Sequence, residues 1–185
     1  KTMILNNFSE GFSIDRPRNR ILWISFAQKT LFQCNLNGSN HLNLFKNNEG
    51  MDLPGTFTGD WSKGKVYWLD YLLDHYIYQA NTDGSSRKPV ATKQIYYPTS
   101  FAVDSATNEI YWVNGQSSYQ KDQAGAVMKG TSNTDIQQLV SSGGRKLYAF
   151  ALDAAHARMY WTDLSSPAQI MGSDLDGTHV ASIVS

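Results

Sequence analysis

Four aspartates are the residues whose spacing could do chemistry. Asp15, Asp60, Asp104 and Asp153 each stand eight residues before a tryptophan. A fold that brought the four carboxylates together would form a ring of hard oxygen ligands suited to Ca²⁺. Alternatively, each carboxylate accepts hydrogen bonds from the turn that follows it, as Asp does in many tight turns. We expect the turn role, with neither metal nor cofactor.

Other catalytic arrangements are missing from the sequence. It contains no Gly-x-Ser-x-Gly elbow, phosphate loop, Cys/His pair or zinc motif, and its four histidines make no metal-ligand spacing. We therefore predict that the protein is not an enzyme. A metal-dependent hydrolase that uses the aspartate ring is a minor alternative.

The tryptophans that follow these aspartates mark a repeat. Trp23, Trp68, Trp112 and Trp161 are separated by 45, 44 and 49 residues, a period typical of repeat architectures. Each tryptophan occupies the same position in a short apolar run, such as Ile21 to Ser25. We predict that all four pack between repeats instead of stacking on sugar rings.

Each repeat predicts four antiparallel strands. The first ends at the aspartate, a short polar turn follows, and the second contains the tryptophan. Asn19, Gly64 and Asn108 stand four residues after their aspartates and tolerate the positive φ of a tight turn, whereas Ala157 fills this place in the last repeat. Asn-Gly or Asp-Gly turns then join the third and fourth strands in three of the repeats. Fourth strands are predicted over residues 41–45, 87–91, 136–140 and 179–184.

A four-stranded unit of this size cannot bury both faces of its sheet alone, so the repeats should stack as blades of a β-propeller. We predict an all-β fold with a single propeller domain over residues 1–185. Its four blades span about 9–49, 54–95, 98–141 and 147–185. A short strand, Thr2 to Leu5, precedes them and is available to close the ring.

The last repeat resembles a known family. Tyr160-Trp161-Thr162-Asp163, preceded by Asp153 and followed by Asp176-Gly177, resembles the YWTD repeat, or low-density lipoprotein receptor class B repeat. The resemblance extends over about residues 9–185. It implies a β-propeller that serves receptors and matrix proteins outside the cell as a non-catalytic ligand platform. Ser25 and Asn114 replace the terminal Asp of the motif, so we expect weaker polar links in repeats one and three.

The number of blades departs from the family, because family propellers have six and this chain carries four repeats. Three outcomes are compatible with that number: a closed four-bladed ring, an assembly in which several chains share propellers, or a fragment whose other blades lie elsewhere. We expect the closed ring, with a homo-oligomer as an alternative.

Composition bounds the partners and the compartment. The 16 basic and 16 acidic residues leave no net charge, which argues against nucleic acid and anionic membranes as partners. No apolar run approaches the roughly 20 residues of a membrane span. Lys1 is not an initiator Met, so we expect a processed or excised chain that is secreted or extracellular. Sequons at Asn7 and Asn37 would then be open to glycosylation.

Cys34 is the single cysteine, so the chain has no internal disulfide. An unpaired thiol in a secreted protein is available for an intermolecular disulfide. Cys34 also aligns with Ala80, Gly130 and Ser173, a position that takes only small residues, and this favours a buried, inert thiol.

Binding residues are expected where the repeats differ. Alternate connections of a meander lie at one end, so the loops between strands two and three share a face with the connections between blades. Tyrosines beside polar residues suit protein interfaces and glycans alike, although such aromatics are also found half-buried at loop bases. We predict a receptor-like site for an extracellular protein, with a secreted, multivalent carbohydrate-binding lectin as the alternative. The predicted binding residues on this face are Tyr71, His75, Tyr96, Tyr97, Tyr119 and Lys121.

Overall fold

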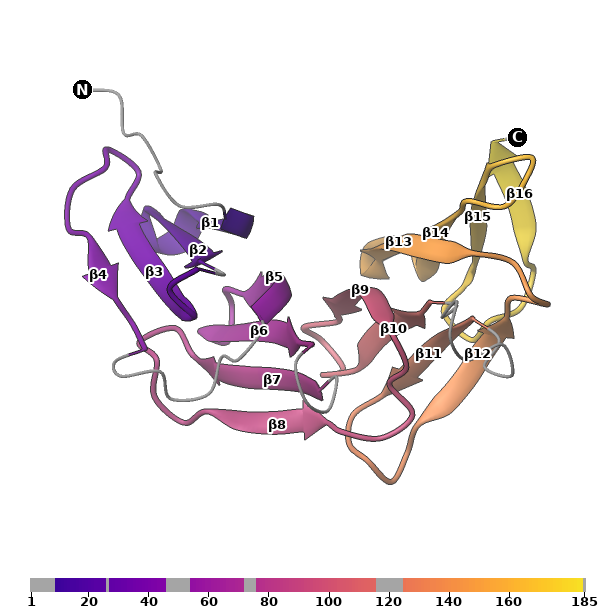
Figure 1. Cartoon of the computed structure of the whole chain (residues 1–185), viewed down its shortest axis with the longest axis horizontal. Coiled ribbons are helices and arrows are strands. Elements are labelled where there is room, and N and C mark those ends of the chain that lie inside the picture. The colour runs from indigo at the N-terminus through magenta and orange to yellow at the C-terminus, as the bar shows by residue number, and fades with distance from the viewer. Residues whose placement is uncertain (1–8, 26, 46–53, 72–75, 116–124, 185) are drawn as a thin grey trace. The chain divides into compact units, whose positions relative to one another are not determined.

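The computed structural model describes residues 9–25, 27–45, 54–71, 76–115 and 125–184. These residues form four antiparallel sheets of four strands each, and every sheet follows the order of the chain (Figure 1). The predicted all-β fold of four-stranded repeats is therefore confirmed. Within the described ranges, no helix is long and apolar enough to cross a membrane.

The chain divides into two compact units, Lys1–Thr92 and Lys93–Ser185, and each unit contains two sheets. We call the sheets blades 1 to 4. Blade 1 consists of β1 (Ser9–Asp15), β2 (Arg20–Ser25), β3 (Thr30–Asn35) and β4 (Leu42–Asn43). Blade 2 consists of β5 (Pro54–Asp60), β6 (Lys65–Asp70), β7 (Tyr76–Asn81) and β8 (Lys88–Ala91).

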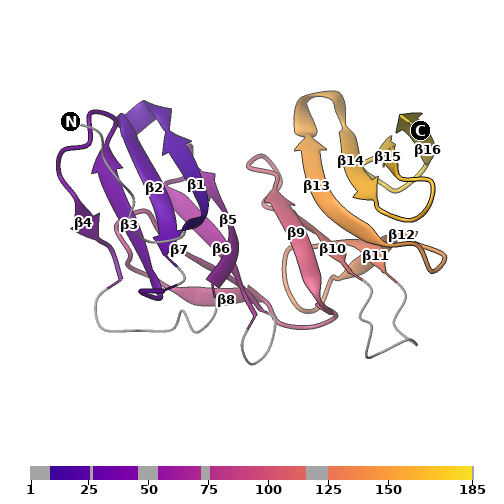
Figure 2. The same cartoon turned by 45° about the horizontal axis from the view of Figure 1, so that its top comes forward.

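The second unit repeats this arrangement. Blade 3 consists of β9 (Pro98–Val103), β10 (Ile110–Asn114), β11 (Ala126–Gly130) and β12 (Gln137–Ser141). Blade 4 consists of β13 (Leu147–Asp153), β14 (Arg158–Asp163), β15 (Gln169–Asp174) and β16 (Ala181–Val184). The first strands of the two blades, β9 and β13, lie side by side (Figure 2).

The observed elements differ from the predicted ones mainly at the edges of the blades. Strand β4 contains only two residues and is shorter than the predicted 41–45. The turn after the first strand is a single 3-10 turn in blades 1 and 4. Ala157 adopts φ +53 at the end of that turn, as Asn19 does at φ +54, so the backbone imposes this conformation even where the residue does not favour it. Thr2 to Leu5 lies outside the described residues.

The four aspartates accept hydrogen bonds from the turns that follow them. Asp15 accepts from the Arg18 N–H at 3.3 Å, Asp60 from the Lys63 N–H at 3.2 Å, and Asp153 from the His156 N–H at 3.2 Å. In blade 3, Asp104 accepts from the Ala106 N–H at 2.8 Å. Elsewhere in the described ranges as well, no three His, Cys, Asp or Glu side chains are placed to hold a metal ion. Each carboxylate therefore caps its own turn.

One buried apolar cluster joins the blades of the first unit. From blade 1 it takes Leu22, Ile24 and Leu31, and from blade 2 it takes Phe57 and Trp68, among others. Antiparallel pairing explains this grouping, because Ile24 lies opposite Leu31 and Phe57 lies opposite Trp68. Full burial of such a side chain contributes about 1.5–3 kcal/mol. The packing between blades is thus the main source of stability in the unit.

The second unit has an equivalent cluster. It combines Tyr111, Val113 and Val127 of blade 3 with Met159 and Trp161 of blade 4. The same two sides of the repeat meet in both units. The side of one blade opposite its own motif tryptophan packs against the side of the next blade that carries the motif tryptophan, which we call the tryptophan face. All four motif tryptophans are buried.

A glycine in the turn between the third and fourth strands permits this close packing. Gly84 and Gly177 have φ +88 and +85, a conformation that L side chains rarely adopt. A Cβ at Gly84 would lie 2.2 Å from the Leu44 carbonyl oxygen, and one at Gly177 would lie 2.5 Å from that of Leu139. In each unit the turn therefore contacts the backbone of the preceding blade. The contact is just after β4 in the first unit and within β12 in the second.

The terminal residue of the motif ties its strand to the connection that enters the blade. Asn114 Nδ2 donates to the Gln94 carbonyl at 2.8 Å, and Asn114 Oδ1 accepts from the Tyr96 N–H at 3.0 Å. In blade 4, Asp163 pairs with Arg145 and accepts from the Ser165 N–H. In repeat three the amide of Asn114 therefore both donates and accepts at the place where the motif has Asp. The expectation of weaker polar links in repeats one and three stays a prediction.

We predict that Gly177→Ala destabilises the fold much more than Gly144→Ala. Gly144 has nearly the same φ, +87 against +85, but a Cβ there would meet nothing within 4 Å. The Gly144 variant should lose about 1 kcal/mol from backbone strain alone. The Gly177 variant should lose about 2–4 kcal/mol because the new methyl group also displaces Leu139. Urea unfolding measures both values, and equal losses would contradict the close approach between blades.

We also predict that Asp163 makes the fold acid-sensitive. Burial raises the pKa of this carboxyl, but the hydrogen bonds from Arg145 and Ser165 outweigh burial and hold the pKa below its ordinary value. The stabilisation is therefore complete above the unfolded value of about 3.9 and is lost as the pH falls through the folded pKa.

Asp163→Asn keeps the shape but removes the charge. We expect it to lower the free energy of unfolding by about 1–2 kcal/mol at neutral pH, a modest loss because Arg145 is partly exposed and screened by solvent. The difference from the wild type should shrink as the pH falls below about 4. Urea unfolding at a series of pH values measures this difference, and a difference that stays constant with pH would contradict the role of the charge.

Candidate functional site

The loop face is the end of each blade that carries the loops between the second and third strands and the connections entering the first strand. Backbone hydrogen bonds show that these segments lie together. The Gly115 N–H donates to the Tyr97 carbonyl at 3.0 Å in blade 3, and the Leu164 N–H donates to the Lys146 carbonyl at 2.8 Å in blade 4. This agrees with the end of the blades at which we placed the binding residues.

The described residues include half of the predicted binding residues. His75, Tyr119 and Lys121 lie outside them. Tyr71 belongs to the first unit, where its ring lies directly over Gly55: a Cβ on that glycine would fall 1.8 Å from the ring. Tyr71 is half-buried, so part of its ring is used in packing. Tyr96 and Tyr97 belong to the second unit.

Tyr96 and Tyr97 are held in place by the backbone beneath them. Asn114 bonds both to the Gln94 carbonyl and to the Tyr96 N–H, and it also accepts from Trp112 Nε1 at 3.1 Å. Gln94 and Tyr97 adopt positive φ values of +53 and +46, which turn the segment outward. The tyrosine residues remain 42% and 37% exposed. Two aromatic rings are thus presented to solvent from a segment fixed by the motif.

A third exposed tyrosine was not predicted. Tyr148 is 55% exposed at the start of β13, and its carbonyl accepts from Thr99 Oγ1 of β9 at 2.6 Å. Its backbone therefore lies beside the segment that follows Tyr97. The signal in the sequence was the alternation of buried Leu147 with Tyr148 at the start of a first strand. We call Tyr96, Tyr97 and Tyr148 the tyrosine patch.

The polar surroundings of the tyrosine patch suit binding. Lys146 is exposed two residues before Tyr148, and its backbone N–H donates to Ser165 Oγ at 2.9 Å. The guanidinium of Arg145 is shared between Asp163 and the Pro167 carbonyl. These contacts hold the connection and the loop together, so the rings stand on a rigid base.

Two further predicted sites have clear positions. Cys34 is buried in β3, and burial raises the pKa of its thiol, so a disulfide to another chain would require this strand to open. Asn37 is exposed in the turn after β3, where its Oδ1 accepts from the Ser39 N–H at 3.0 Å. Asn7 lies outside the described residues.

Comparison with known families supports the repeat. Residues 64–105 and 157–185 match the low-density lipoprotein receptor repeat class B. The vitellogenin receptor Yl of Drosophila melanogaster is 27% identical over 101 residues, which is 55% of this chain. The low-density lipoprotein receptor-related protein 5 of Mus musculus is 26% identical over 124 residues, or 62% of this chain. The matched regions are 5% and 7% of those proteins, so the chain corresponds to a small part of each.

Comparison with solved structures supports the fold. A chain in the crystal structure of the nidogen/laminin complex matches with a TM-score of 0.77 at 15% identity, over 96% of this chain and 65% of the other. A putative TolB from Agrobacterium tumefaciens matches with a TM-score of 0.72 at 10% identity, over 92% of this chain and 63% of the other. At these identities the matches concern the fold alone.

The spacing of the motif, the matched repeats and the four-stranded blades agree with one another. Two segments of the chain, residues 64–105 and 157–185, therefore match the low-density lipoprotein receptor class B, or YWTD, repeat. The four-stranded sheets match the fold of a β-propeller.

Proposed function

We propose that this chain is a non-catalytic, extracellular ligand-binding module that recognises a partner protein through the loop face. The observation that carries the proposal is the tyrosine patch, Tyr96, Tyr97 and Tyr148, exposed on a base fixed by hydrogen bonds. One relative is named a vitellogenin receptor and another a low-density lipoprotein receptor-related protein, which supports a receptor-like role and an extracellular setting. The predicted binding residues His75, Tyr119 and Lys121 lie outside the described residues and stay predictions.

The physical advantage of the tyrosine patch is preorganisation. Tyrosine offers a large contact surface with few rotatable bonds, and aromatic residues are enriched among those that dominate binding energy. The segment of Tyr96 and Tyr97 is already fixed by Asn114, so little conformational entropy is lost when a partner binds. A partner that covers these rings would therefore gain affinity from each of them.

The alternative ligand is a glycan, because exposed tyrosine rings also pack against sugar faces. The solved structure with the higher TM-score was determined as a complex with laminin, a protein, and this favours a protein ligand for the present chain. A multivalent lectin would need equivalent patches on several blades. Blade 4, however, has Tyr148 where blade 3 has Thr99, so the patch differs from blade to blade.

Surface plasmon resonance with the immobilised chain tests the proposal. Laminin and vitellogenin are the first protein ligands to inject, because the names of the similar proteins indicate them. We expect saturable binding of at least one of them. The triple variant Tyr96→Ala, Tyr97→Ala, Tyr148→Ala should weaken that binding by about tenfold or more.

Val180→Ala is the matched control in the same unit. Val180 is 44% exposed and follows the turn between β15 and β16, at the opposite end of its blade. The affinity of the Val180→Ala variant for the same protein ligand should stay within about twofold of the wild type. Circular dichroism establishes that each variant is folded. Binding only to a glycan array, with inhibition by a simple sugar, would replace the proposal with the lectin alternative.

A further inference from the structure

The charged residues of the second unit are sorted between the two ends of its blades. We call the end of a blade opposite the loop face the turn end, because it carries the turns after the first and third strands. All described acidic residues of this unit except Asp163 lie at the turn end: Asp104, Glu109, Asp135, Asp153, Asp174 and Asp176. The neutral composition of the whole chain therefore conceals a local asymmetry of charge.

The described lysine and arginine residues at the turn end are paired with these acids. Lys129 Nζ lies 2.9 Å from Glu109 Oε1, and Arg158 Nη1 lies 2.6 Å from Asp174 Oδ1. The turn end has more carboxylates than lysine and arginine side chains, so its net charge is negative while the histidines are neutral.

The loop face of the second unit has the opposite sign. Its only described carboxylate, Asp163, is 1% exposed and pairs with Arg145. Lys93 and Lys146 are exposed, and neither has a carboxylate partner among the residues that the structure describes. Both ammonium groups are therefore left uncompensated on the face that carries the tyrosine patch.

Lys146 and Tyr148 lie on one side of the chain where it enters blade 4. Residues 146–148 are exposed, buried and exposed in turn, with Leu147 in the core. The ammonium group and the tyrosine ring therefore face the same way. A step of two residues along an extended chain spans about 7 Å. One short segment of a ligand can thus contact both side chains.

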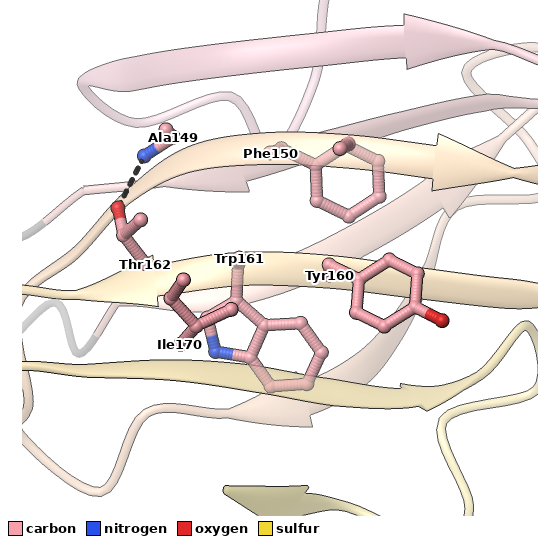
Figure 3. Close-up of a pocket in the computed structure, with 7 residues that line it drawn as sticks. Ala149, Phe150, Tyr160, Trp161, Thr162 and Ile170 are labelled. Carbon is pink, nitrogen blue, oxygen red and sulfur yellow. Dashed lines mark hydrogen bonds between the residues drawn. The ribbon is translucent and has the colours of Figure 1, made fainter. Parts of the chain in front are cut away.

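The start of β13 is held in this conformation by its neighbours. Its pairing with β14 contains a β-bulge between Leu147 and Phe150, a feature that redirects side chains. Within the bulge the Ala149 N–H donates to Thr162 Oγ1 at 2.9 Å (Figure 3). The bulge therefore keeps its backbone bonded while it presents Tyr148 to solvent.

The connection into blade 3 is built in a similar way. Lys93 stands three residues before Tyr96, and Ile95 between them is 6% exposed, so a buried side chain anchors the segment. Asn114 Nδ2 donates to the Gln94 carbonyl at 2.8 Å and fixes the same stretch. Each part of the tyrosine patch therefore has an exposed lysine on its own segment, two or three residues before it.

We propose that the tyrosine patch binds an acidic, extended segment of the partner protein, whose carboxylates pair with Lys93 and Lys146 while an apolar side chain packs on the tyrosine rings. This inference rests on the proposed function, because it gives the chemistry of the ligand at the same face. The negative turn end repels such a partner and the loop face attracts it, so the asymmetry of charge orients its approach.

A polyanion such as a sulfated glycan or a nucleic acid is a weaker match to this surface. Polyanions are bound through many cations that neutralise a dense row of charges. The described loop face instead has few uncompensated cations, with aromatic rings beside them. A segment of polypeptide can present carboxylates and an apolar side chain together.

Fluorescence anisotropy with the full chain and short labelled peptides tests the proposal. The acidic peptide carries glutamates on both sides of a central pair of leucines, and two matched peptides carry glutamine or lysine in place of glutamate. The acidic peptide should bind about fivefold or more tightly than the glutamine peptide at low salt. Its affinity should fall as NaCl is added, because exposed charges are screened.

Charge reversal at the two lysines provides the decisive measurement. Lys93→Glu, Lys146→Glu should lose the preference for the acidic peptide and favour the lysine peptide, whereas Lys93→Arg, Lys146→Arg should keep the original preference. Arg16→Glu, Lys88→Glu is the matched control. It makes the same change in net charge with exposed residues at the turn ends of blades 1 and 2, so it should bind like the wild type. Circular dichroism establishes that each variant folds.

The outcomes separate this inference from the proposed function. Tyrosine-dependent binding of laminin or vitellogenin that the Lys93→Glu, Lys146→Glu variant retains would leave the proposed function intact and overturn the acidic ligand. Equal binding of the acidic and glutamine peptides, or no binding of either, would also overturn it. Binding of heparin that displaces the acidic peptide and survives removal of the three tyrosine rings would replace the acidic segment with a polyanion.

Discussion

The packing of one blade on the next is the interaction on which the rest of the structure depends. A four-stranded sheet with apolar residues on both faces is not stable alone, because either face would remain in water. In each unit the second and third strands of one blade meet the tryptophan face of the following blade. The backbones approach so closely that the turn at Gly84 or Gly177 has no room for a side chain.

Polar residues at the two ends of the second strand bind the adjoining turn and connection and hold both in place. At one end the aspartate caps the turn that leads into the strand, as Asp15 and Asp153 do. At the other end Asn114 or Asp163 binds the connection that enters the blade. These contacts position the segments of the loop face. Variation in the loops can therefore change the surface of the loop face without changing the blades, because the ties lie within the repeat.

The repeat was predictable because its period and its aspartate–tryptophan spacing recur four times. The local turn at Ala157 was only partly predictable, since its positive φ is imposed by the motif and not by the residue. Tyr148 was missed because the prediction looked for tyrosines in loops, whereas this one begins a strand. The exposure of Ile170 could not be predicted either, because its equivalents are buried by another blade and not by their own sequence.

In the last repeat, a full match to the motif does not mean that all of its side chains are buried. Tyr160-Trp161-Thr162-Asp163 is the copy that matches the family motif most fully, and its residues alternate between a buried and a partly exposed side of blade 4. Trp161 and Asp163 are buried because the preceding blade and the connection to their own blade cover them. Tyr160 and Thr162 lie on the other side of the sheet, where they are partly exposed. Half of the motif is therefore buried within its own unit by blade packing, and burial of the other half is not determined by the motif itself.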